Sequence, residues 1–179
     1  MMITWHHLIF YTAPAEPQEP ASVPGLAFTV YLDETDVPFD ALPCPRYEAV
    51  YRDRLRSGHE LLVGLLDDDV VFSAWLADTV LRVDELRWYW HVQRDDMVIY
   101  DVITAAHARG RGIYPAALRF ARTLAARRGL RRCWIYAEHG NSASRRGIEK
   151  AGFTPYRTRY ALQVGKAVLR PNTMSETEP

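Results

Sequence analysis

The sequence predicts a single domain of the mixed α/β class, with one central sheet and helices packed on its faces. Three observations lead to this prediction. The chain has 179 residues, the usual size of one domain. Nearly half of its residues are apolar and a quarter are charged, as in a soluble globular protein. Its apolar patterns begin with several antiparallel strands and end with strands and helices in alternation.

The first hundred residues supply most of the antiparallel strands. Aromatic and β-branched residues at 3–12 and alternation at 26–33 predict two strands, joined by a proline-rich surface connector. Between Pro45 and Gly58, apolar residues recur at helical spacing, which predicts a helix that begins and ends at these two residues. Two predicted hairpins follow, with turns at 67–69 and 93–96.

The remaining residues alternate between strands and helices. Asn141 and Gly152 are a typical N-cap and C-cap, and they bound the shorter of the two helices. Residues 1–170 are expected to form the domain, and the polar end at 171–179 is expected to be disordered. The predicted elements are a strand at 97–105, a helix at 112–129, a strand at 131–138, a helix at 141–153 and a strand at 156–165.

The net charge of zero hides a strong asymmetry along the chain. Residues 101–170 contain 15 Lys and Arg against three acids, whereas the rest contains seven bases and 19 acids. A basic part of this kind favours a polyanionic partner, although arginines on helix surfaces also serve solubility. Charge alone leaves both interpretations open.

Several classes of protein are not expected. No apolar run reaches the roughly 20 residues that span a bilayer, and the N-terminus lacks the features of a signal peptide, so we expect a cytoplasmic protein without a membrane partner. Cys44 and Cys133 form no CxxC pair and no disulfide framework. The aspartates at 67–69 are interpreted as turn residues, so no metal site is expected.

The stretch HARGRG, residues 107–112, is the strongest chemical signal. Two glycines between a strand and a helix expose backbone amides, and the helix end adds positive charge, so the turn is suited to phosphate. A P-loop is excluded because Ile113 follows Gly112, and a dinucleotide-binding turn is excluded because Pro115 replaces its third glycine. The alternative is that the glycines only form a tight turn.

Two motifs together resemble the GNAT superfamily of N-acetyltransferases. HARGRG resembles its acetyl-coenzyme A signature [Q/R]xxGx[G/A], with His107 in place of the first Gln or Arg. Thirty residues later, NSASRRGIEKAGF resembles its second motif, a helix that begins with Asn and ends in EKxGF. The resemblance covers roughly residues 61–162 and implies a GNAT-like fold, with a twisted, mostly antiparallel sheet and helices on both faces.

The resemblance also implies a set of coenzyme-binding residues. The strand before the glycine turn would splay from the next strand, and the pantetheine arm would pair with backbone groups of Val102, Ile103 and Thr104. The pyrophosphate would lie on the turn, formed by Arg109, Gly110, Arg111, Gly112, Ile113 and Tyr114. Asn141 and Ser144 would contact the coenzyme from the start of the last helix, although Asn141 is also a plain N-cap.

The catalytic residues are less clearly marked. Many GNAT enzymes have a tyrosine before the EK pair that protonates the leaving thiolate, and this chain has Ile148 there. Another group could protonate the thiolate, or the thiolate could leave with help from water or from the helix ends. Alternation at 97–105 places Tyr100 and Val102 on one face and Asp101 on the other. Tyr100 is therefore a candidate acid and Asp101 a candidate base or amine anchor, although they could instead pack the core and hold a loop.

The function implied is transfer of an acetyl group from acetyl-CoA to a primary amine, without a metal. Within the fold, a longer acyl group or a sugar or peptide amine remains an alternative. The alternative from another class is a module that binds coenzyme A or nucleic acid without catalysis. Nucleic acid is disfavoured because the arginines lack interleaved exposed aromatics for base stacking. The resemblance also allows a homodimer.

Overall fold

The computed structural model describes residues 3–19, 23–165 and 167–169, and the predicted tail at 171–179 lies outside them. Its α-helices are α1 (Glu48–Arg56), α2 (Ile113–Arg127) and α3 (Ser142–Lys150). Its strands are β1 (Ile3–Pro14), β2 (Leu26–Tyr31), β3 (Glu60–Leu66), β4 (Asp69–Ala77), β5 (Val80–Val83), β6 (Trp88–His91), β7 (Asp96–Thr104), β8 (Arg132–Glu138), β9 (Thr154–Val164) and β10 (Ala167–Leu169).

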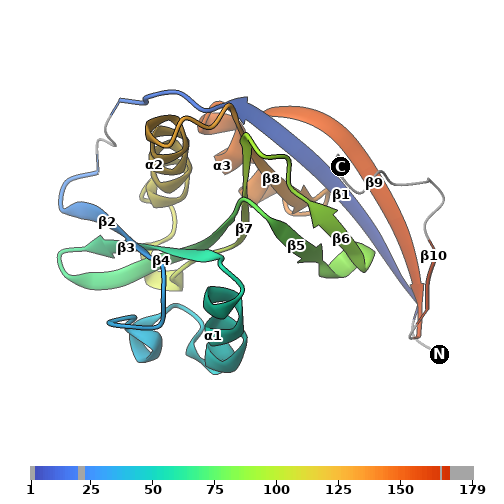
Figure 1. Ribbon diagram of the computed structural model, residues 1–179, viewed down its shortest axis with the longest axis horizontal. Coiled ribbons are helices and arrows are strands. Elements are labelled where there is room, and N and C mark those ends of the chain that lie inside the picture. The colour runs from blue at the N-terminus through green and yellow to red at the C-terminus, as the bar shows by residue number, and fades with distance from the viewer. Residues whose placement is uncertain (1–2, 20–22, 166, 170–179) are drawn as a thin grey trace.

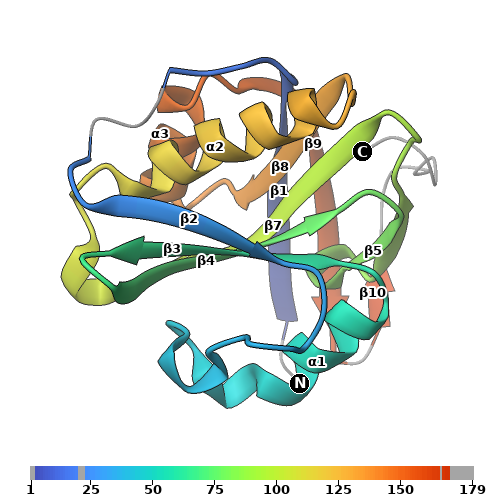
Figure 2. The same ribbon diagram turned by 60° about the vertical axis from the view of Figure 1, so that its left-hand side comes forward.

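One twisted sheet of eight strands organises the molecule, in the order β10-β9-β1-β8-β7-β4-β3-β2. Every neighbouring pair is antiparallel except β7 and β8. Helices α2 and α3 lie on one face of the sheet and α1 lies on the other (Figures 1 and 2). The predicted fold class is therefore confirmed, as a mixed and mostly antiparallel sheet with helices on both faces.

The first strand of the chain lies among the last ones. Strand β1 pairs antiparallel with β8 on one side, where Leu8 lies opposite Glu138. On its other side β1 pairs with β9, where Trp5 lies opposite Leu162. The side chain of Phe10 is fully buried, so β1 contributes to the core as well as to the sheet. This pairing fixes β8 from its outer edge, away from β7.

The second predicted hairpin is wrong, because β6 does not pair with β7. Instead, β5 and β6 form a separate two-stranded sheet. Trp88 and Trp90 alternate with exposed neighbours along β6 and are buried, and both rings contact Phe10 edge to face. Burial of these two large rings turns β6 onto the face of the main sheet. The first hairpin is confirmed, with Asp67 and Asp68 at positive φ in its turn.

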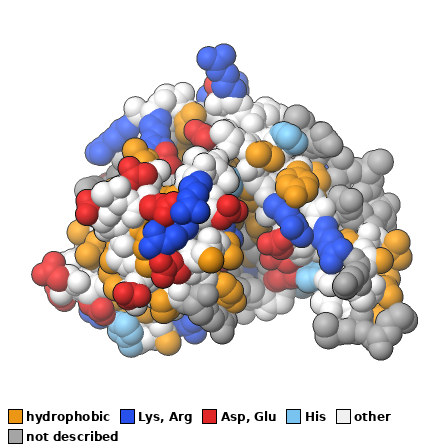
Figure 3. Space-filling view, turned by 60° about the horizontal axis from the view of Figure 1, so that its bottom comes forward, with side chains coloured by type: hydrophobic (Ala, Val, Ile, Leu, Met, Phe, Trp, Pro, Cys, Tyr) orange, Lys and Arg blue, Asp and Glu red, His pale blue; other side chains and the backbone are white. Residues whose placement is uncertain are grey.

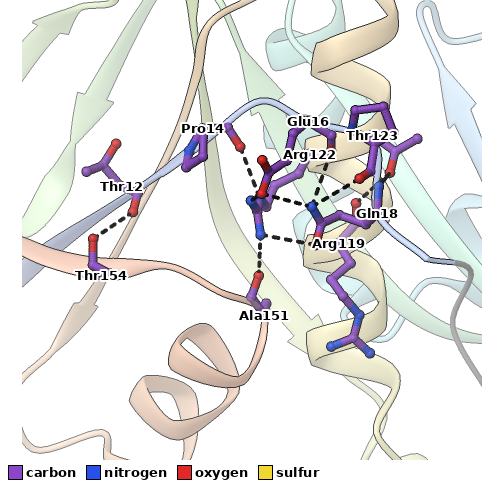
Figure 4. A network of polar contacts seen from close by, with 10 residues as sticks. Thr12, Pro14, Glu16, Gln18, Arg119, Arg122, Thr123, Ala151 and Thr154 are labelled. Carbon is purple, nitrogen blue, oxygen red and sulfur yellow. Dashed lines mark hydrogen bonds and ion pairs between the residues drawn. The ribbon is translucent and has the colours of Figure 1, made fainter.

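Arg122 of α2 connects the end of β1, the connector after β1 and the end of α3. This side chain of α2 is buried, at 3% exposure. Its Nε donates to the carbonyl oxygen of Pro14 over 3.1 Å, and Nη1 donates to the carbonyl oxygen of Ala151 over 2.9 Å. Its guanidinium also contacts Gln18 and forms an ion pair with Glu16 (Figure 4). The end of β1, the connector after it and the end of α3 are thereby joined.

We expect Arg122→Ala to lower the free energy of unfolding by about 3 kcal/mol, because it leaves the buried carbonyl oxygen of Ala151 and the partly buried one of Pro14 without this donor. Urea unfolding measures the effect. Arg119→Ala is the matched control on the same helix: the half-buried Arg119 donates to the carbonyl oxygen of Lys150 over 3.2 Å at the surface, and its loss should matter far less. Equal losses in the two variants would contradict the role given to Arg122.

Candidate functional site

The site is created where β7 and β8 separate. Their parallel pairing covers Asp96 to Ile99 on β7 and ends at the Ile99–Ile135 pair. Beyond that point β7 stays paired with β4 as far as Thr104, and β8 stays paired with β1 as far as Glu138. Each strand is thus held on its outer side while a gap opens between the two. The predicted splay of these strands is present.

A β-bulge at Asp101 changes the direction of the side chains in β7. Asp101 has a φ of 47°, and the pairing with β4 shifts between Ser73 and Trp75. The alternation predicted from the sequence therefore fails here. Val102 packs against the core cluster under α2, and Tyr100 belongs to the cluster on the opposite face. The side chain of Asp101 lies on the same side of the sheet as that of Tyr100, since Arg54 contacts both.

The glycine turn presents open backbone at the start of α2. Gly110 and Gly112 have φ values of 78° and 79°, which favour glycine. A Cβ at Gly110 would meet no atom within 4 Å, so nothing covers the turn there. Gly112 is the N-cap of α2 and makes no side-chain cap, which leaves the first amides of the helix to solvent or to a ligand.

A cavity of about 720 Å³ lies along this turn, between β7, α2 and α3. Three of its lining side chains are cationic, namely Arg109, Arg146 and Lys150, and none is acidic, so we call it the basic cavity. All of the predicted coenzyme residues line it except Arg111. The predicted residues that line it are Val102, Ile103, Thr104, Arg109, Gly110, Gly112, Ile113, Tyr114, Asn141 and Ser144.

The sequence interpretation missed the cationic face of α3. Arg146 and Lys150 are four residues apart, a spacing that puts both on one side of this helix and that could have revealed them as a pair, and both line the basic cavity. His107 does not line either cavity; its Nε2 lies 3.0 Å from the Asp69 carboxylate. Arg109 lines the basic cavity and donates from Nε to the carbonyl oxygen of Thr104.

A second cavity of about 510 Å³ lies on the α1 side of the gap. Its lining includes four carboxylic acids and two arginines, so we call it the acidic cavity. The face that carries α1 is hollowed between groups of acidic and basic side chains (Figure 3). The acids are Asp84, Glu85, Asp101 and Glu138, the arginines are Arg54 and Arg82, and Tyr47, Tyr51, Tyr100 and Tyr136 add aromatic surface.

Tyr100 lines the acidic cavity, but its hydroxyl is held by His59. The Tyr100 oxygen lies 2.5 Å from His59 Nδ1, and His59 Nε2 lies 2.9 Å from the carbonyl oxygen of Val80. Because that carbonyl can only accept, Nε2 carries the proton and Nδ1 accepts from the tyrosine. Burial lowers the pKa of His59, which agrees with a neutral ring. Burial also raises the pKa of Tyr100.

The predicted Asp101 carboxylate lies in the acidic cavity and is paired with Arg54. Nη1 of Arg54 donates to Asp101 Oδ2 over 2.5 Å. The same guanidinium lies over the Tyr100 ring, 5.0 Å from its centre. Arg54 was not found from the sequence, because its place on α1 gives no sign of a contact 47 residues away. The catalytic roles of Tyr100 and Asp101 stay predictions.

Two further carboxylates lie at the far side of the acidic cavity. Oε1 of Glu138 accepts from His6 Nδ1 over 3.0 Å, and its Oε2 accepts from the backbone of His7 over 3.2 Å, so β1 holds this side chain. Burial, reinforced by the neighbouring Glu138 and Asp84, raises the pKa of Glu85. Neighbouring acids that repel one another favour the binding of a cationic ligand.

The basic and acidic cavities meet at four residues, Val102, Tyr114, Asn141 and Ser144. Asn141 is the predicted N-cap of α3, since its Oδ1 accepts from the Ser144 amide over 3.1 Å. Its side-chain nitrogen keeps two N–H donors that the cap does not use. Ile148 is fully buried in the core and faces neither cavity.

The described residues contain no group of three or more His, Cys, Asp or Glu that could hold a metal ion. Among the same residues, no helix is both long and apolar enough to cross a membrane. Neither cysteine is in a disulfide, and Cys133 is buried.

Comparison with known proteins identifies a family. The sequence model of the acetyltransferase (GNAT) family matches residues 29–153. That range contains both predicted motifs and all of the residues that line the two cavities. No curated protein sequence was found to match.

Solved structures agree with this fold at low sequence identity. A GCN5-related N-acetyltransferase from Sphaerobacter thermophilus has a TM-score of 0.61 at 16% identity, over 96% of this chain and 54% of that one. A GNAT-family acetyltransferase from Colwellia psychrerythraea has 0.59 at 16% identity, over 90% and 56%. A glucosamine N-acetyltransferase region of a fungal multi-domain enzyme has 0.63 at 16% identity, over 87% and 21%. This chain thus spans about half of the Sphaerobacter and Colwellia proteins and about a fifth of the fungal enzyme.

The buried His59 should make the stability depend on pH. Its pKa lies below the ordinary 6.5 in the folded state, so the unfolded state binds more protons below that pH. We therefore expect the free energy of unfolding to fall between about pH 7.5 and pH 5.5, and the fall to be smaller in His59→Gln. Urea unfolding at both pH values measures it. The exposed His91→Gln serves as control, and an unchanged slope in His59→Gln would contradict the assignment.

Proposed function

Since the chain belongs to the GNAT family of acetyltransferases, we propose that it transfers an acetyl group from acetyl-CoA to a primary amine. One observation carries this proposal: two cavities of opposite charge meet in the gap between β7 and β8. A reaction between an anionic donor and a cationic acceptor needs both surfaces, joined at the place where the reacting atoms meet.

The basic cavity suits the coenzyme. Its glycine turn offers uncovered backbone amides at the start of α2, and three cationic side chains surround it. Phosphate groups would lie there, since Arg146 and Lys150 of α3 line the same cavity as the turn. The gap-side backbone of Val102 to Thr104 has no partner in β8, so it can pair with the amides of an extended arm.

The acidic cavity suits an amine. Its four carboxylates outnumber its two arginines, so a protonated amine is attracted there. Thioester aminolysis needs the amine neutral, so one proton must leave the nitrogen before or during attack. Asp101 is the proposed acceptor or anchor for this nitrogen, since its carboxylate is partly exposed at the gap. A backbone amide of the splayed strand would polarise the carbonyl.

Coenzyme binding tests the first half of the proposal. Gly110→Trp places a bulky side chain over the turn and should weaken coenzyme A binding about tenfold or more, equivalent to about 1.4 kcal/mol, by isothermal titration. Gly129→Trp is a matched control, because Gly129 also has a positive φ, meets no atom within 4 Å of a Cβ and lines neither cavity. Equal affinities in both variants would rule out the turn as the binding site.

Acetyl transfer tests the second half. The wild-type chain should release free thiol from acetyl-CoA in the presence of at least one amine of a panel that includes alkyl, sugar and peptide amines. Asp101→Asn should slow this release by about 10² while coenzyme affinity stays the same. Asp53→Asn, on the exposed side of α1 and outside both cavities, should leave the rate unchanged. Release at the wild-type rate in Asp101→Asn would remove this carboxylate from the mechanism.

A further inference from the structure

We propose that the Tyr114 hydroxyl protonates the leaving sulfur, with Ser144 as its hydrogen-bond partner. This inference rests on the proposed acetyl transfer. It assigns the proton donor for the leaving sulfur, which the sequence did not identify because Ile148 stands at the usual tyrosine position. It depends on where Tyr114 lies, on what makes room for its ring and on which other hydroxyls reach the same place.

Tyr114 lies at the junction of the two cavities. It is the second residue of α2, directly after the glycine turn, and its ring crosses to α3. Its hydroxyl oxygen lies 2.9 Å from Ser144 Oγ. Of the four residues that line both cavities, only Tyr114 and Ser144 carry hydroxyls, and the two are bonded to each other. An acetyl donor from one cavity and an amine from the other must meet beside this pair.

Gly147 makes room for the Tyr114 ring. A Cβ on Gly147 would lie 2.2 Å from Cδ1 and 2.7 Å from Cε1 of that ring, so no side chain fits there. Glycine in a helix interior costs about 1 kcal/mol relative to alanine. The next residue, Ile148, is turned into the core. Gly147 and the inward-facing Ile148 therefore leave space on the surface of α3 for the Tyr114 ring from α2.

The other tyrosines do not reach both cavities. Tyr100 donates its hydroxyl hydrogen to His59 and lines only the acidic cavity. Tyr47, Tyr51 and Tyr136 line only the acidic cavity. Among the described residues, Tyr114 is therefore the one phenol placed between donor and acceptor.

The proton balance of the step closes. A C–N bond forms between the amine nitrogen and the carbonyl carbon, the C–S bond breaks, and sulfur leaves with the bonding electrons. Tyr114 gives its hydroxyl proton to that sulfur. The amine attacks in its neutral form, after a first proton has passed to solvent through Asp101 or water. It loses a second proton as the amide forms, and the Tyr114 oxygen recovers that proton through the Ser144 hydroxyl or water. The products are an amide and a free thiol, and the protein returns to its starting state.

The environment of Tyr114 suits this task. Burial raises its pKa to about 12, so the phenol is protonated at neutral pH and available as a donor. The hydrogen bond from Ser144 lowers the pKa and thus favours the phenolate that remains after transfer. A thiol has an ordinary pKa of about 8.5, so the transfer is uphill unless the amine proton returns. The hydroxyl pair at the junction gives that return a short route.

Tyr114→Phe tests the assignment, because it keeps the ring against Gly147 and removes only the hydroxyl. We expect kcat for acetyl-CoA to fall by about 10² or more, with coenzyme A affinity changed less than about twofold. Tyr100→Phe is the comparison at a hydroxyl that lines one cavity only, and its kcat should fall less. A wild-type kcat in Tyr114→Phe would overturn the proposal.

The leaving group separates chemistry from structure. With an acetyl thioester of an acidic aryl thiol, the sulfur departs without needing a proton, so the deficit of Tyr114→Phe should largely disappear. A merely structural role predicts the same deficit for both donors, and that result would contradict the proposal. Failure of the proposed function itself looks different: the wild-type chain would then bind no coenzyme A and release no thiol with any amine.

A second variant keeps both ring and hydroxyl. Fluorinated tyrosine at residue 114 has a more acidic phenol, so the loss of kcat at alkaline pH should move to lower pH than in the wild-type enzyme. The profile would not move if Tyr114 only packs against Gly147. Such an unmoved profile would count against the proposal even if Tyr114→Phe folded poorly.

Discussion

The separation of β7 from β8 is the constraint on which the rest of the site depends. The two strands share hydrogen bonds only up to Ile99 and Ile135, although both continue for several residues. They can stay apart because each is paired on its other side, β7 with β4 and β8 with β1. A strand left unpaired on both sides would expose too many backbone groups. The place of β1 between β9 and β8 therefore supports the gap directly, and β1 also holds Glu138 at its edge.

Features that depend on local backbone geometry could be predicted from the sequence. Gly110 and Gly112 occupy conformations that favour glycine, and Asn141 caps α3 with its own side chain. These fixed positions also place the residues next to them along the chain. Almost the whole predicted coenzyme set therefore lines one cavity. Arg111 is the exception, since a turn of two left-handed glycines points neighbouring side chains in different directions.

Features that depend on distant partners could not be predicted. Nothing near Asp101 marks it for a positive φ, and the resulting bulge reversed the predicted direction of Val102. The pairing of β1 with β8 joins residues more than a hundred positions apart, and alternation alone carries no information on a strand's neighbours. Arg54 and Arg122 act through partners on other elements, so their roles appear only once the chain is folded.

The charge asymmetry of the chain acquires a spatial meaning in this arrangement. The basic part, residues 101–170, provides all three cations of the basic cavity. Asp84 and Glu85, from the acidic part, line the acidic cavity together with Asp101 and Glu138, two of the three acids of the basic part. Charges of opposite sign on the two sides of the gap attract an anionic ligand to the basic cavity and a cationic ligand to the acidic cavity. The same charges repel each ligand from the other cavity. A polyanion that ran along the surface would need the cations on an open face. Three of the cations, Arg109, Arg146 and Lys150, instead line a cavity, and this placement favours a compact phosphorylated ligand over a nucleic acid.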